Sequence, residues 1–138
     1  MVATGHVDLA EQFALVEAAR RLGVKTVMTH ALETLVGPDH TLDDVRALAE
    51  RGAIIEFTYL TCVPGGIAAT EQPETFARAM MAVGPERAIM STDFGQAASP
   101  RPAVGMALFI EEMLRQGVPA AAVDLMARRN PARLLGLA

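Results

Sequence analysis

Two histidines and one aspartate stand just after apolar runs of this sequence, where side chains that do chemistry are often placed. They are His6 in VATGHVD, His30 in KTVMTH and Asp93 in AIMSTDFG. Two imidazoles and a carboxylate are a donor set that suits a divalent metal ion. In parallel α/β folds, ligands and substrates gather outside the carboxyl ends of the strands. The three residues are therefore a candidate metal site.

Simpler roles for these residues stay open on the pattern alone. His30 could cap a helix or form a loop hydrogen bond, and Asp93 could hold an Asx turn at Phe94 and Gly95. The polar segment Ser91–Gln96, however, directly follows an apolar run. A carboxylate there needs backbone N–H groups or a cation as its partner, and we favour a cation.

Other polar side chains are weaker candidates. Glu56 interrupts an apolar run, so its carboxylate is expected to point into a polar barrel centre or toward a sheet edge. Thr58 and Tyr59 close the same run and could line a pocket or simply pack. We expect His40 to be a structural residue of a surface loop and Cys62, the single cysteine, to be an inert thiol.

Apolar runs alternate with helical patterns along the chain, as in parallel βα units. The expected strands are Lys25–Thr29, Ala53–Leu60 and Arg87–Thr92, with a stub at Val2–Thr4. Successive parallel strands end at the same edge of a sheet, even when their positions in the sequence are far apart. This arrangement would bring the candidate site residues together.

Capping patterns mark the start of two helices between these strands, and glycines mark their ends. A third helical stripe stops at Gly84–Pro85. The C-terminal tail is expected to be all helical, with a break at Asn130–Pro131. The two capped helices are predicted from Asp8 and Glu11 to Gly23, and from Thr41 and Asp44 to Gly52.

Composition limits the possible classes of protein. A chain of 138 residues with 51% hydrophobic residues predicts a single domain over residues 1–138. A formal charge of -4, no basic cluster and 4% aromatics argue against a nucleic-acid partner. The apolar runs fall short of the roughly 20 residues that cross a bilayer. The start lacks a signal-peptide pattern, so a cytoplasmic location is expected.

Four segments of the chain resemble the amidohydrolase superfamily of metal-dependent hydrolases, specifically its amidohydrolase-like branch with a compact (β/α)8 barrel. They are ATGHVD, GVKTVMTHALETLVG, GPERAIMSTDFGQ and RRNPARLLGL. The resemblance implies an α/β fold that forms the C-terminal half of a TIM barrel with a helical tail. It matches His6 to the family's fifth-strand histidine, His30 to its sixth-strand histidine and Asp93 to its eighth-strand aspartate.

The same resemblance implies a chemistry. In the family the histidines bind a divalent metal, often zinc, and the aspartate binds the metal and shuttles a proton from the attacking water. The expected activity is hydrolysis of an amide, ester or lactone bond in a small-molecule substrate, with His6, His30 and Asp93 as metal ligands and Asp93 as general base. Zinc is the expected metal, although manganese, iron and cobalt accept the same donors.

The chain departs from the family in one large respect. It has no counterpart of the paired first-strand histidines or of the bridging group from the fourth strand. It is thus a fragment or a natural half-barrel, and its open sheet edges predict self-association or a partner chain that completes the barrel. Two other functions stay open: a non-catalytic barrel remnant or oligomeric scaffold, and a phosphate-binding isomerase that uses N–H groups at Gly65–Gly66 and Gly95–Gln96.

Overall fold

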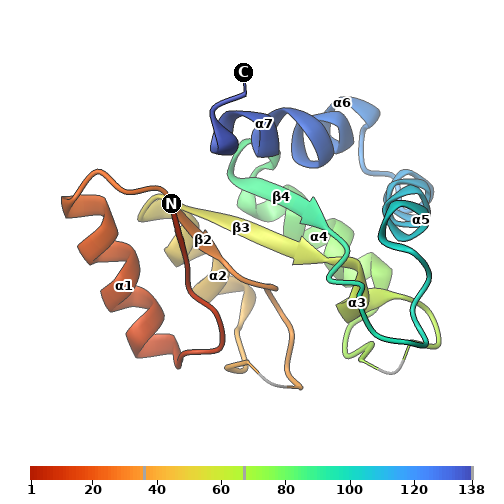
Figure 1. Ribbon diagram of the computed structural model, residues 1–138, viewed down its shortest axis with the longest axis horizontal. Helices are drawn as coiled ribbons and strands as arrows, with labels where there is room; N and C mark the ends of the chain where they lie inside the picture. Colours follow the sequence, from red (N-terminus) through yellow and green to blue (C-terminus); the bar gives the residue numbers. More distant parts are fainter. Residues whose placement is uncertain (36, 67, 138) are drawn as a thin grey trace.

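The computed structural model describes residues 1–35, 37–66 and 68–137. In these ranges one sheet of parallel strands has the order β1-β2-β3-β4, so each strand pairs with its neighbour in the sequence (Figure 1). The predicted alternation of strands and helices is confirmed, and each strand is shorter than its apolar run. The strands are β1 (Val2–Ala3), β2 (Thr26–Met28), β3 (Ala53–Thr58) and β4 (Ala88–Ser91).

Helices connect the strands and build the C-terminal tail. None of those in the described ranges combines the length and apolar character that a membrane crossing needs. The helices are α1 (Leu9–Arg21), α2 (Leu42–Glu50), α3 (Tyr59–Cys62), α4 (Pro73–Val83), the 3₁₀ turn η1 (Pro85–Arg87), α5 (Pro102–Arg115), α6 (Ala120–Asp124), the π-helical turn η2 (Leu125–Arg129) and α7 (Asn130–Leu135).

The predicted capping patterns start α1 and α2 as expected. Asp8 accepts a hydrogen bond from the Glu11 amide, and the Glu11 carboxylate accepts one from the Asp8 amide. Thr41 and Asp44 form the same reciprocal pair before α2. The glycine that follows each helix has a φ of 66° or 100°, a left-handed conformation that favours glycine. Hydrogen bonds and glycines that are local in sequence therefore set the start and the end of both helices.

The strand predicted over Ala53–Leu60 is too long. The extended backbone ends at Thr58, and the short helix α3 follows at once. The hydroxyls of Thr58 and Thr61 lie 2.8 Å apart across this turn, and the Leu60 amide donates to the Thr92 carbonyl at 3.1 Å. These contacts turn the chain at the carboxyl edge of the sheet before the apolar run is complete.

The predicted break at Asn130–Pro131 is wrong, because the helical backbone continues through it. The π-helical turn η2 precedes Pro131, and the Asn130 amide donates to the Leu125 carbonyl in the wider π pattern. Pro131 itself donates no backbone hydrogen bond, and the wider π turn lies directly before it. The Asn130 side chain is buried and donates to the Pro85 and Ala88 carbonyls, both at 2.7 Å, so it joins the tail to the start of β4.

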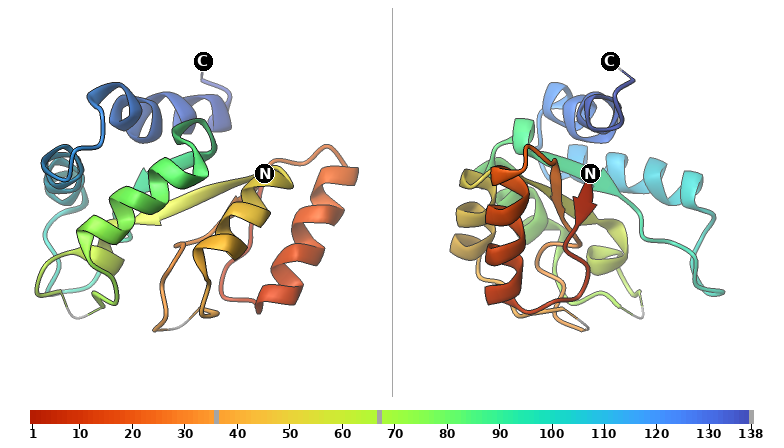
Figure 2. Two further views of the ribbon diagram at one scale, coloured as in Figure 1. Left: turned by 180° about the vertical axis from the view of Figure 1, so that it is seen from behind. Right: turned by 60° about the vertical axis from the view of Figure 1, so that its left-hand side comes forward.

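Helices α1, α2 and α4 lie on one face of the sheet (Figure 2). The alternate strand residues that point to this face are buried and belong to the main core. Phe57 packs edge-on against Phe76 with ring centroids 5.4 Å apart. Tyr59 stacks on Phe109 at 4.9 Å, so its role is packing rather than lining the site. The strand residues of this core are Met28, Ala53, Ile55, Phe57, Ala88 and Met90.

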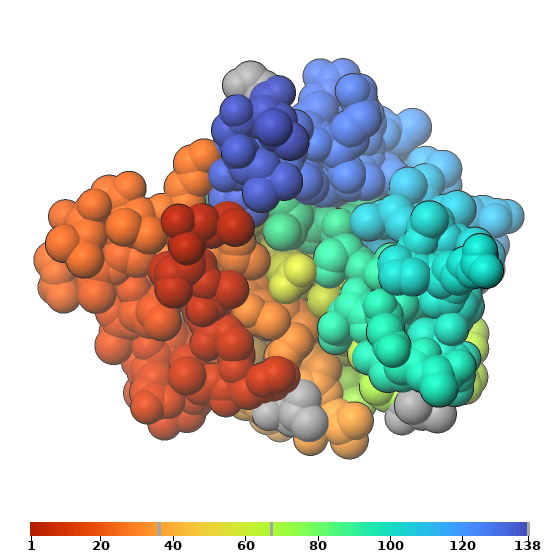
Figure 3. Space-filling model, in the orientation of Figure 1, coloured from red at the N-terminus to blue at the C-terminus, as the bar shows by residue number. Residues whose placement is uncertain are grey.

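The opposite face of the sheet is open. Val27 and Ile54 are register partners, as are Glu56 and Ile89, and none of the four belongs to the core on the helical face. Ile54 and Glu56 are partly exposed, whereas Val27 and Ile89 are buried, and yellow atoms of β3 reach the surface beside the N-terminal segment in Figure 3. Glu56 therefore projects from the middle of the sheet and not from an edge. In a closed barrel, this open face would line the interior.

Candidate metal site

The structure brings the three predicted site residues to the same edge of the sheet. His6 follows β1, His30 follows β2 and Asp93 follows β4. Side chains from the turn after β3 lie between them. Together they line a small cavity of about 80 Å³ whose lining is His6, His30, Glu33, Leu35, Leu60, Thr61, Ala68 and Asp93.

His30 is the buried member of this group, with 6% of its surface exposed. Neither ring nitrogen forms a hydrogen bond with any part of the described chain. Its ring lies against the His6 ring, with centroids 4.7 Å apart and planes inclined by 37°. Buried imidazole nitrogens without hydrogen bonds are costly unless another ligand satisfies them. His30 therefore brings two nitrogens without hydrogen bonds to the cavity, of which Nδ1 lies 3.9 Å from the Glu33 carboxylate, and this suits a ligand-binding role.

Asp93 is exposed, and its carboxylate does not form the Asx turn that was left open as an alternative. The Phe94 amide donates to the Thr92 hydroxyl at 3.3 Å, and the Gly95 amide donates to the Gln96 side chain at 3.1 Å. The main-chain carbonyl of Asp93 accepts from the Gln96 amide group at 3.1 Å. Neighbouring groups thus stabilise the loop and leave the carboxylate to another partner.

Backbone strain is concentrated at this site. In the described ranges, the residues other than glycine with positive φ are His30 at 32°, Leu32 at 66° and Asp93 at 54°. A side chain in this region of backbone space costs energy, and such residues cluster where function requires a fixed geometry. Two of the three are predicted site residues.

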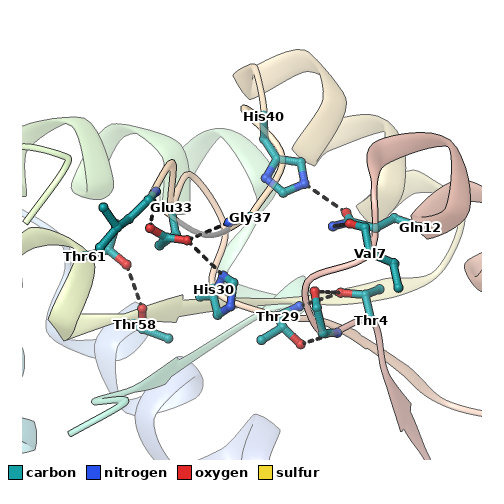
Figure 4. A network of polar contacts seen from close by, with 12 residues as sticks. Thr4, Val7, Gln12, Thr29, His30, Glu33, Gly37, His40, Thr58 and Thr61 are labelled. Carbon is teal, nitrogen blue, oxygen red and sulfur yellow. Dashed lines mark hydrogen bonds and ion pairs between the residues drawn. The ribbon is translucent and has the colours of Figure 1, made fainter. Parts of the chain in front are cut away.

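A pair of threonines fixes the ends of β1 and β2 relative to each other. The Gly5 amide donates to the Thr29 hydroxyl and the Thr29 amide donates to the Thr4 hydroxyl, both at 3.1 Å (Figure 4). The bonds cross from one strand to the next immediately before His6 and His30. They fix the backbone positions from which the His6 and His30 side chains project.

His40 was expected on the surface, but this prediction is wrong, because only 6% of the residue is exposed. Its Nε2 lies 2.9 Å from the Gln12 side-chain oxygen, and the Gln12 amide donates to the Val7 carbonyl at 3.2 Å (Figure 4). An amide oxygen only accepts, so this contact assigns the proton to His40 Nε2. The chain of contacts supports the loop that carries His6.

Two residues near the cavity have chemistry that the sequence did not resolve. Cys62 is 1% exposed, and burial raises the pKa of its thiol to about 12, so it is inert as expected. Glu33 was missed, although it lines the cavity and is 6% exposed. Its position three residues after His30, behind two apolar residues, was the signal that could have identified it.

The donor types fit a divalent metal, but only as part of a larger set. Imidazole and carboxylate suit zinc and related ions, and His30 has open nitrogens beside the cavity. Within the described ranges, no three His, Cys, Asp or Glu side chains are close enough to hold an ion by themselves. The described part of the chain therefore has donors for only part of the ligand set that an ion needs.

Comparison with known proteins shows the fold. Residues 1–56 match a family of unknown function (DUF6282). No curated protein matches the chain. An apo structure of ATU3138 from Agrobacterium tumefaciens matches with a TM-score of 0.60 and 19% identity, over 96% of this chain and 49% of that chain. An N-acetyl-D-glucosamine-6-phosphate deacetylase from Mycobacterium smegmatis matches with a TM-score of 0.50 and 21% identity, over 90% of this chain and 41% of that chain.

The chain thus spans about half the length of these two solved chains. At such low identity the likeness is one of fold, and function has to be argued from the site. The predicted fold class, a parallel α/β sheet that makes up half of a barrel, is confirmed.

Proposed function

We propose that this chain is the C-terminal half of a metal-dependent hydrolase of the amidohydrolase superfamily, acting on an amide, ester or lactone bond. The observation that carries the proposal is the convergence of His6, His30 and Asp93 on one cavity, where neither nitrogen of the buried His30 is hydrogen-bonded. The fold likeness to a protein named as a deacetylase supports it.

In this proposal His6, His30 and Asp93 would supply part of the ligand set of a divalent ion, with zinc as the first choice. When bound, the ion supplies a Lewis acid and an activated water. The Asp93 carboxylate, which accepts no hydrogen bond from the described residues, takes up the proton and delivers it to the leaving group. The exposure of Asp93 and His6 gives a small-molecule substrate access to the cavity.

Under this proposal, the chain needs a partner chain or a further segment for full activity. The family's first-strand histidines and fourth-strand bridging group have no counterpart in the sequence. The open sheet face and the free edges of β1 and β4 are where a partner chain, or a preceding segment, would complete the barrel. The added chain or segment would bring the remaining metal ligands.

Zinc binding by the untagged chain tests the proposal. We expect the wild-type protein to bind one zinc ion in a calorimetric titration. His30→Ala and Asp93→Ala should each weaken binding at least about tenfold, because each removes a donor of the site. Circular dichroism should show the fold unchanged in both variants.

Two matched variants serve as controls. Asp39→Ala removes an exposed carboxylate of the loop before α2, and Glu50→Gln removes the charge of an exposed carboxylate at the end of α2, both outside the cavity. Both should bind zinc as the wild type does. Undiminished binding in both His30→Ala and Asp93→Ala would contradict the proposal, as would a wild-type chain that takes up no zinc, manganese, iron or cobalt.

One observation favours the alternative of a non-catalytic barrel remnant or scaffold. No closed metal-binding group exists among the described residues. In that case the wild-type chain binds no metal, and the two site variants change neither metal content nor hydrolysis. The same titration separates the two functions.

A further inference from the structure

A buried acid faces the buried histidine of the candidate site. The Oε2 atom of Glu33 lies 3.9 Å from Nδ1 of His30, and each side chain is 8% exposed. Both residues line the cavity at the carboxyl edge of the sheet. A carboxylate that is buried against an imidazole is a group that can orient it.

The turn that follows Glu33 fixes the carboxylate in this place. The Gly37 amide donates to Oε2 at 3.0 Å, and the Leu35 amide donates to Oε1. The backbone at Gly37 also lies against His30, since a Cβ atom there would be 3.5 Å from both the His30 Cε1 and the Glu33 Oε2. Figure 4 shows Glu33 and Gly37 on the same side of the His30 ring. The acid is therefore held toward Nδ1 by main-chain groups.

The chemistry of the two groups sets the position of the proton. A neutral imidazole carries one N–H, and an ionised carboxylate can only accept a hydrogen bond. The 3.9 Å between Nδ1 and Oε2 is longer than a hydrogen bond, and a proton on Nδ1 would direct this N–H toward the Glu33 carboxylate and leave the lone pair on Nε2. The nitrogen that binds a ligand is set by the hydrogen bond that the other nitrogen makes.

We infer that Glu33 is a positioning residue, which holds the His30 ring through Nδ1 and keeps Nε2 as the nitrogen that is free to bind a metal. This inference rests on the proposed function, in which His30 is a metal ligand. It adds to that function the residue that selects the tautomer and orientation of the ligand. Glu33 itself does not have to touch the metal or the substrate.

The state of the His30 ring in the metal-free chain tests the inference directly. Long-range ¹H–¹⁵N correlation spectra distinguish a ring protonated at Nδ1 from one protonated only at Nε2. The chain has three histidines, and His30→Gln identifies the His30 signals by their loss. We expect a wild-type ring with Nδ1 protonated at mildly alkaline pH. In Glu33→Gln, whose amide can donate to Nδ1, the proton should move to Nε2.

A zinc titration provides the second measurement. Glu33→Gln should weaken zinc affinity about tenfold or more, as is typical for loss of a group behind a histidine ligand. Glu50→Gln, at the exposed end of α2, is the matched control and should change neither the tautomer nor the affinity.

Different outcomes overturn the inference and the proposed function. A wild-type His30 ring protonated only at Nε2 overturns the inference, and so does a ring that keeps its proton on Nδ1 in folded Glu33→Gln. Both readings are made without metal, so the wild-type tautomer decides even if the variant does not fold. A wild-type chain that binds no metal while its ring is protonated at Nδ1 counts against the proposed function alone.

Discussion

At the scale of single residues, His40 is a buried histidine whose charge matters for stability. Burial lowers the pKa of its imidazole below the usual value of 6.5, although Asp44 and Asp39 act in the opposite direction. Its Nδ1 has no hydrogen-bond partner among the residues that the structure describes. The neutral ring is therefore the form that the folded chain prefers.

This preference predicts a pH dependence of the free energy of unfolding. The unfolded chain binds a proton at His40 near pH 6.5, whereas the folded chain binds it only at lower pH. Stability is then lost as the pH falls from above 6.5 to below the folded-state pKa. Urea unfolding at a series of pH values should show this loss in the wild type and a smaller one in His40→Gln. Equal pH slopes in the two proteins would contradict the prediction.

The residues of the candidate site could be predicted from the sequence only where one local rule sufficed. A polar residue directly after an apolar strand identified His6, His30 and Asp93, and the structure brings them to one cavity. Gln12 was not identified, because a fully buried glutamine in an amphipathic helix depends on partners that are distant in the sequence. His40 was placed on the surface for the same reason, since its burial depends on α1.

At the scale of elements, the starts of α1 and α2 and the helical character of the C-terminal tail could be predicted from the sequence, whereas the continuation of the tail through Pro131 could not. The capping boxes of α1 and α2 involve residues three positions apart, so the sequence alone contains the whole interaction. The continuation of the tail through Pro131 depends on the π-helical turn η2 and on Asn130, whose partners lie before and within β4. No local pattern contains those contacts.

Asn130 should be one of the residues that matter most for stability outside the core. Asn130→Ala removes two buried hydrogen bonds and leaves the Pro85 and Ala88 carbonyls without these donors. We expect the free energy of unfolding to fall by about 2–3 kcal/mol, measured by urea denaturation. Gln72→Ala, which truncates an exposed amide without a capping hydrogen bond, is the control and should change little. A loss as small as that of the control would show that the Asn130 hydrogen bonds do not stabilise the fold.

At the scale of the whole molecule, the sheet is covered on one face only. The helices bury Met28, Ile55 and Phe57, whereas Ile54 and Glu56 on the other face are partly exposed. β1 and β4 are the edge strands, and no further strand of the described chain pairs with their outer main-chain groups. Open edges and apolar surface are the two features that most often drive association.

We predict that the isolated chain self-associates through this open face. Sedimentation velocity should show an average mass that rises with protein concentration. Ile54→Lys places a charge on the face and should shift the protein toward monomer, while Leu22→Lys, at the exposed end of α1, should not. A monomer at high concentration, or equal association in wild type and Ile54→Lys, would contradict the prediction.

The strand order has a consequence for how the chain reaches this structure. Each strand pairs with the next one along the chain, from Val2 with Thr26 to Ile55 with Ala88, so each pairing closes a shorter segment of chain than a strand order with crossovers would. Folding is faster when contacting residues are near in sequence, because less chain entropy is lost before contacts form. The long-range exception is the tail, where the Lys25 ammonium donates to the Arg133 and Leu134 carbonyls. The topology thus favours a nucleus in the sheet, to which the C-terminal segment is added last.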